Sequence, residues 1–173
     1  MTVSLYDMTV GSYQQILGAL DGFLSKTRDH FKDDKNCLDE LVSIRLHDDM
    51  LPFEFQVKTT IYEALGAIRG AQKGSFSPPP PSPATDFNGL CGLVKQALEE
   101  LKTVTPEEIA ALEGRDVRFT VGDQGIDFLA EDFLLTFSLP NFYFHAATTY
   151  DLLRMKGVPL GKRDFLGQMR TKG

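Results

Sequence analysis

The sequence predicts an all-α protein, an antiparallel four-helix bundle with a small β-hairpin before the last helix. Apolar residues recur at spacings of three and four in four long segments, which is the periodicity of a helix with one buried face. Two stretches of alternating apolar and polar residues flank a glycine-rich turn at 122–125, a pattern typical of a hairpin. The 173 residues suffice for one domain, residues 1–173, with a buried core.

The first helix is expected from Ser4 to about His30, with Ser4 and Asp7 forming an N-terminal cap. A short helical piece follows over residues 38–46. Six apolar side chains form the stripe of the first helix: Tyr13, Ile16, Leu17, Leu20, Phe23 and Leu24.

The second long helix is expected to begin at Pro52, because a proline in the first turn after a carboxylate is a helix-start signal. It runs to about Gln72, where Gly74 favours termination. The proline-rich loop 74–85 lies within the domain and predicts extended polyproline II backbone. We interpret it as a spacer between two helices; a partner-binding motif is the alternative.

A stripe of apolar residues from Leu90 to Leu101 predicts the third helix. Residues 105–108 are expected to cap the start of a further helix. The hairpin strands are expected at 117–121 and 126–128. The last helix begins near Glu131 or after Pro140 and ends at about residue 156. The tail 161–167 is expected to be a docked or extended loop.

The composition excludes several classes of partner. A net charge of -6 disfavours binding to nucleic acid, whose backbone phosphates would be repelled. Apolar runs stay below the ~20 residues of a membrane helix, and the first residues do not resemble a signal peptide, so we expect a soluble, cytoplasmic protein without a membrane partner. Cys37 and Cys91 lie far apart in the sequence and are expected to be reduced thiols, the alternative being a disulfide or a nucleophilic pair.

The stretch 139–145 carries the strongest chemical signal. Asn141 and His145 are four residues apart, a spacing that places two side chains on one helix face, as two metal ligands would be. Only His145 is a strong ligand, so half of a metal-binding pair is present. It is either a core histidine hydrogen-bonded to a neighbour, or a metal ligand or proton donor at a pocket.

Other residues are weaker candidates. His47 precedes Asp48 and Asp49, and this cluster would either bind a cation or cap a helix at the surface. Gln56 is a good buried hydrogen-bond partner, and Tyr143 would reach a polar pocket beside His145. Four phenylalanines are expected in the core, with a subunit interface as the alternative for part of them: Phe133, Phe137, Phe142 and Phe144.

Several of these segments resemble a known family. Residues 4–7, 49–53, 139–145 and 157–165, with Gln56 and Val57, resemble an uncharacterised bacterial and fungal family of unknown function. That family is similar to the DinB/YfiT-like metalloenzyme bundles. The resemblance implies a bundle in which one histidine of the second helix and a histidine pair of the last helix hold a divalent metal. Here these positions fall on Gln56, Asn141 and His145, so two imidazoles are replaced by amides.

Two hypotheses follow. The first is a homodimeric module that binds a small, unidentified ligand or partner in a degenerate metal-type pocket of Gln56, Asn141, His145, Tyr143 and Asp49, without a cofactor. The second is a metal-dependent enzyme, of thiol transferase or hydrolase type, in which His145 and either Asp49 or His47 hold zinc or nickel. Contact of His145 with Asp49 or His47 would favour the enzyme, and hydrogen bonds of His145 with Gln56 and Asn141 would favour the binding module.

Overall fold

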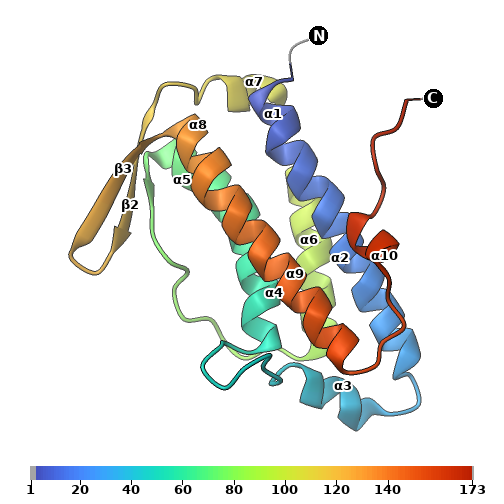
Figure 1. Ribbon diagram of the computed structural model, residues 1–173. Helices are drawn as coiled ribbons and strands as arrows, with labels where there is room; N and C mark the ends of the chain where they lie inside the picture. The colour runs from blue at the N-terminus through green and yellow to red at the C-terminus, as the bar shows by residue number, and fades with distance from the viewer. Residues whose placement is uncertain (1–2, 173) are drawn as a thin grey trace.

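Four helical rods form the body of the protein and lie side by side (Figure 1). The computed structural model describes residues 3–172, with the backbone alone at residues 35 and 36. The first rod contains α1 (Leu5–Met8) and α2 (Val10–His30), and the third is α6 (Phe87–Leu101). The second rod contains α4 (Phe53–Ile61), the π-helix η1 (Tyr62–Gly66) and α5 (Ala67–Lys73). The fourth contains α8 (Ala130–Asp132), the π-helix η2 (Phe133–Ser138) and α9 (Leu139–Met155).

Local sequence signals account for most helix ends. Ser4 and Asp7 form the predicted capping box, and the second rod starts after Pro52 and ends at Gly74, whose φ of 79° suits glycine. The last rod is continuous from Ala130 through Pro140, so the earlier of the two predicted starts is correct. The wider π turn lies directly before Pro140, whose ring would otherwise meet the carbonyl of the preceding turn.

The remaining helices are short. α3 (Lys35–Leu41) follows α2 and begins at the Asp34 cap, and α7 (Pro106–Ala110) begins at a Thr105 capping box. α10 (Lys162–Leu166) corrects the expected loop in the tail: the segment is docked, but it is helical. It lies on α2, where the Gln15 side-chain amide donates to the Leu166 carbonyl at 2.8 Å.

The all-α prediction is wrong, because the protein also contains a three-stranded mixed sheet. β2 (Asp116–Val121) and β3 (Gln124–Leu129) form the predicted hairpin, and β1 (Ser75–Phe76) pairs in parallel with β2. β1 lies inside the predicted proline-rich loop, where the sequence shows no strand periodicity. Phe76 holds it in place, since its buried ring contacts Phe119, Phe133 and Phe137, all distant in sequence.

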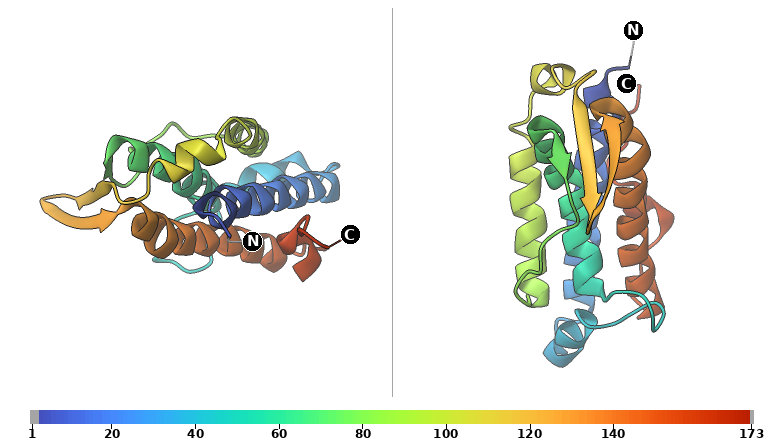
Figure 2. Two further views of the ribbon diagram at one scale, coloured as in Figure 1. Left: turned by 90° about the horizontal axis from the view of Figure 1, so that it is seen from above. Right: turned by 90° about the vertical axis from the view of Figure 1, so that its left-hand side faces the viewer.

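The sheet stands at one end of the bundle, next to α5 and α8, and the hairpin projects away from the helices (Figure 2). The core fills the space between the rods, and its largest fully buried rings are Tyr13, Phe23, Phe53, Phe87, Phe133 and Phe142. Cys37 and Cys91 are free thiols, as expected. Between residues 3 and 172, no helix is long and apolar enough to cross a membrane.

Candidate functional site

Gln56 and His145 meet between α4 and α9, two helices that run antiparallel (Figure 1). The side-chain nitrogen of Gln56 donates to the Leu51 carbonyl at 2.8 Å, and its Oε1 lies 2.7 Å from Nδ1 of His145. Because a carbonyl can only accept, the bond to Leu51 fixes the orientation of the amide. The Gln56 oxygen therefore accepts from His145, and Nδ1 carries the proton.

This arrangement determines the chemistry of the imidazole. With the proton on Nδ1, Nε2 keeps its lone pair, and none of the described residues hydrogen-bonds to it. Burial lowers the pKa of His145 to about 4, so the ring is neutral at physiological pH. The rings of Phe55 and Phe144 approach the imidazole at centroid distances of 5.9 and 5.2 Å, which gives the pair an apolar surround. His145 can thus accept a hydrogen bond from a ligand in an apolar environment.

Asn141 and Tyr143 do not join the pair. The side-chain amide of Asn141 donates to the Phe137 carbonyl of η2, in the same rod, at 2.8 Å, although Asn141 lies one turn before His145. Tyr143 is exposed, and its ring packs on Phe142 instead. The structure therefore brings together Gln56 and His145 from the predicted set, with Asn141 as a neighbour.

His47 and Asp49 lie in the loop between α3 and α4 and contact each other. Nδ1 of His47 is 2.7 Å from an Asp49 carboxylate oxygen, and the two side chains are 73% and 82% exposed. The pair thus lies at the surface, but it does not form the helix cap that was its predicted alternative, since α4 begins after Pro52 without a side-chain cap. In the part of the chain that the structure describes, no three His, Cys, Asp or Glu side chains are placed to hold a metal ion together.

The donor set does not fit zinc or nickel. Both polar atoms of the Gln56 amide are already engaged, one with Leu51 and one with His145. Asn141 donates its side-chain nitrogen to the Phe137 carbonyl of η2 and could offer only a neutral amide oxygen. His145 remains as the one imidazole of the three family positions, whereas borderline metals require several nitrogen or sulfur donors.

A buried acid, which sequence reasoning missed, lies two turns from Gln56 on the same rod. Glu63 in η1 is 6% exposed, its Oε2 has no hydrogen-bond partner, and burial raises its pKa to about 8. Ser138 of η2 donates to the Glu63 backbone carbonyl, so the Tyr13 hydroxyl must donate to Ser138, at 2.7 Å. The sequence contained one signal for Glu63: it follows Gln56 by seven residues, a spacing that places both side chains on one helix face.

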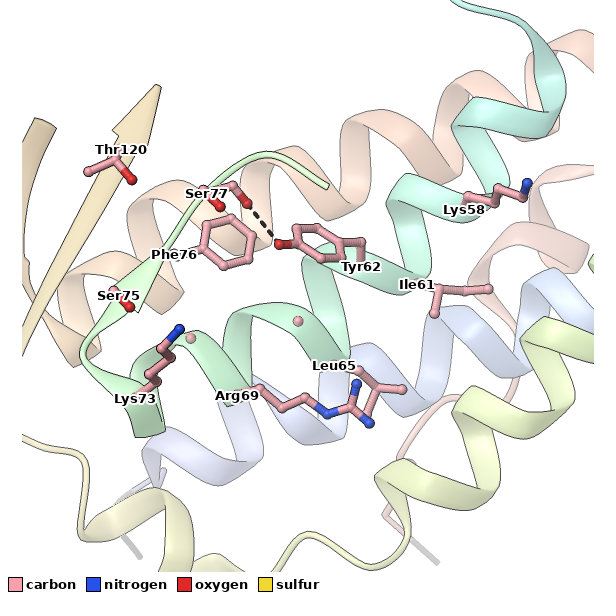
Figure 3. Close-up of a pocket in the computed structure, with 12 residues that line it drawn as sticks. Lys58, Ile61, Tyr62, Leu65, Arg69, Lys73, Ser75, Phe76, Ser77 and Thr120 are labelled. Carbon is pink, nitrogen blue, oxygen red and sulfur yellow. Dashed lines mark hydrogen bonds between the residues drawn. The ribbon is translucent and has the colours of Figure 1, made fainter. Parts of the chain in front are cut away.

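An open groove lies on the outer face of the second rod, beneath β1 (Figure 3). It has a volume of about 590 Å³ and is lined by Lys58, Arg69 and Lys73, among others. Two of these cations are neutralised, because Lys58 pairs with Glu54 and Arg69 with Glu100. The groove is thus less cationic than its lysines and arginine suggest, and it does not include His145.

The antiparallel rods, with Gln56 and His145 in contact between the second and the last, define a helical bundle with a small sheet at one end. The sequence model of a family described as a domain of unknown function, DUF1993, matches residues 5–166. The chain belongs to this family.

A solved structure supports the fold. A DinB family member protein from Shewanella denitrificans superimposes with a TM-score of 0.79 at 24% sequence identity, covering 98% of this chain and 95% of the other. No protein in the curated set matches the sequence. The predicted resemblance to an uncharacterised, DinB-like family is therefore confirmed, and no activity comes with it.

Proposed function

We propose that the protein is a homodimeric binding module for a small ligand that donates a hydrogen bond to His145. The observation that carries the proposal is the hydrogen bond between Gln56 and His145, which holds a neutral imidazole with its Nε2 lone pair available. A hydroxyl or N–H group is the ligand chemistry that matches such an acceptor. The Phe55 ring would contact the apolar part of the ligand.

Metal analysis separates this proposal from a metal-dependent enzyme. Tag-free protein and a His145→Ala variant are incubated with zinc and nickel, desalted and analysed by mass spectrometry. We expect neither protein to retain stoichiometric metal, because one imidazole and two neutral amides bind such ions weakly. Stoichiometric metal that is lost in the variant would overturn the proposal and favour the enzyme that uses His145 with Asp49 or His47.

A fragment screen tests the binding itself. Small alcohols, phenols and amides are screened by ligand-observed NMR against the wild type, His145→Ala and His47→Ala. We expect fragments that lose binding in His145→Ala but keep it in His47→Ala, since His47 is an exposed histidine paired with Asp49. If every bound fragment also binds His145→Ala equally well, His145 is not the ligand site.

A further inference from the structure

β3 is the edge strand of the sheet, and half of its N–H groups point away from β2. The strand order is β1-β2-β3, and β3 pairs with β2 in one continuous register. The Ala130 N–H donates to the Arg115 carbonyl at 2.8 Å, and bonded pairs alternate along antiparallel strands. Gly125 and Asp127 therefore direct both N–H and C=O outwards, and Leu129 directs its N–H outwards. Between residues 3 and 172, no backbone group outside the sheet donates to or accepts from Gly125 or Asp127.

This edge lacks the usual protection against a further strand. Natural edge strands are blocked by a lysine, a proline, a bulge, or a helix or loop that covers them. β3 contains neither lysine nor proline nor a bulge, its residues are exposed except Phe128, and the hairpin projects away from the helices (Figure 2). The carboxylate of Asp127 accepts from Nη1 of Arg118 on β2, at 2.7 and 2.8 Å, so its charge is neutralised.

Arg118 lies across β3 and presents free donors at this edge. A Cβ at Gly125 would lie 2.6 Å from Nη2 and 2.7 Å from Nε of Arg118, so the guanidinium occupies the space that a side chain there would fill. Nη1 is bonded to Asp127, whereas Nη2 and Nε have no hydrogen-bond partner among the described residues. Because a guanidinium has five N–H donors in a planar fork, its free side matches a second carboxylate.

The other face of the hairpin is apolar near its tip. Val121 and Ile126 lie on this face and are 51% and 55% exposed. Successive side chains of a strand point to opposite faces of the sheet. A strand added along the β3 edge would therefore place alternate side chains against Arg118 and against Ile126.

We propose that β3 binds an extended, acidic-apolar peptide segment of a partner protein, which adds a fourth strand antiparallel to β3. Its backbone would bond to the outward groups of Gly125 and Asp127. An acidic side chain opposite Gly125 would pair with the free donors of Arg118, and the adjacent apolar residue would cover Ile126. The surface is separate from the proposed ligand site, because His145 lies on α9.

The test measures binding of labelled peptides to the full-length chain by fluorescence anisotropy. The probe peptide contains, in order, threonine, valine, threonine, valine, glutamate, valine and threonine; two matched peptides carry glutamine or lysine in place of the glutamate. We expect saturable binding of the glutamate peptide, about threefold weaker binding of the glutamine peptide and still weaker binding of the lysine peptide, since an exposed ion pair contributes little. Arg118→Gln should abolish this preference. Arg69→Gln is the matched control and should keep it, because Arg69 is an exposed arginine paired with Glu100 on another element.

Leu129→Pro tests the strand pairing. The Leu129 N–H points outwards and its φ is −75°, so proline fits this position without removing a bond to β2. We expect the variant to melt at the wild-type temperature and to bind the glutamate peptide about tenfold more weakly, through loss of one backbone hydrogen bond.

Amide hydrogen exchange locates the bound peptide. Binding should slow exchange at the outward N–H groups of Gly125 and Asp127. Exchange at Ile126 and Phe128, which bond to β2, should change little. The inference is overturned if glutamate and lysine peptides bind equally, if Leu129→Pro binds like the wild type, or if slowed exchange occurs elsewhere. Protection of the same N–H groups that increases with protein concentration, without peptide, would assign the edge to a second copy of the chain and also overturn it.

Discussion

At the scale of residues, a single glutamine determines which nitrogen of His145 carries the proton. Gln56 occupies a position where the resemblance to metal-binding bundles implies a histidine, and its amide is locked by the Leu51 carbonyl. Its oxygen can only accept, so it selects the Nδ1-protonated tautomer of His145 without adding charge. Because no charge compensates for burial, the imidazole remains neutral.

Replacing Gln56 by a carboxylate should reverse this effect. In Gln56→Glu, a negative oxygen faces Nδ1 and stabilises the imidazolium, so we expect the pKa of His145 to rise well above its wild-type value of about 4. NMR titration of the imidazole measures the change. Asn141→Ala is the control and should leave the pKa of His145 unchanged, because Asn141 bonds to Phe137. An unchanged pKa in Gln56→Glu would contradict the assigned hydrogen bond.

Glu63 should make stability fall with rising pH. Its pKa is about 8 in the folded protein against 4.5 in the reference state, so the folded state binds more protons between these values. The contribution of Glu63 to the free energy of unfolding is fully present below pH 4.5 and is lost as the pH rises through 8. The free energy of unfolding falls by at most about 1.4 kcal/mol per pH unit.

His145 affects stability in a lower pH range than Glu63. Its pKa is lowered from 6.5 to about 4, so its contribution is present above pH 6.5 and is lost as the pH falls through 4. Urea unfolding between pH 6.5 and 8 therefore isolates Glu63. We expect a decline of stability in the wild type and a flatter profile in Glu63→Gln; equal slopes in both proteins would refute the assignment.

At the scale of elements, β1 depends on a close approach of the strand to α5. A Cβ at Gly70 would lie 2.8 Å from the Phe76 ring and 3.2 Å from the Ser75 carbonyl oxygen. Glycine thus allows the strand to lie directly on the helix, and Phe76 then joins the aromatic cluster beneath the hairpin. The sheet is attached to the bundle through this contact.

Two glycine substitutions should therefore change the free energy of unfolding in opposite directions. Gly70→Ala should destabilise the protein by about 1–3 kcal/mol, because the new methyl group displaces Phe76 or β1. Gly18→Ala in α2 should stabilise it by up to about 1 kcal/mol, since no atom lies within 4 Å and alanine favours helix. Chemical denaturation of both variants checks the pair. Stabilisation by both substitutions would show that the strand can move away at little cost.

At the scale of the whole molecule, the proposed homodimer needs an apolar surface. Phe133 and Phe142 are buried in the core, whereas Phe144 is 56% exposed on α9, close to His145. Of the four phenylalanines that the sequence assigned to core or interface, Phe144 is thus the one that presents a large apolar surface to solvent. We place it in the proposed subunit contact.

Light scattering after gel filtration tests this assignment. We expect a mass twice the 19.3 kDa of the chain for the wild type, and a shift towards the monomer in Phe144→Asp, which introduces a charge into the contact. Met155→Asp is the control, because Met155 is similarly exposed, at 52%, near the other end of α9. A monomeric wild type, or an equal shift in both variants, would refute a dimer through Phe144.

The candidate site could be predicted only in part. Gln56 and His145 were identified because their positions within recognised segments are local features of the sequence. The bonds of Asn141 to Phe137, and of His47 to Asp49, depend on which rotamers the finished fold allows. Glu63 was missed, since a polar residue on a helix becomes a chemical feature only when neighbouring elements bury it.

The sequence by itself determined the four rods, the hairpin and the helix ends, because periodicity, caps and turn residues act over a few neighbouring positions. Only the tertiary structure decided that β1 exists, that the tail is a docked helix and that the proline segment lies along α4. Each of these depends on contacts between residues far apart in the chain, such as Phe76 with Phe133 and Lys58 with Pro83. Such contacts leave no local period in the sequence, since their energy comes from surfaces that meet only after folding.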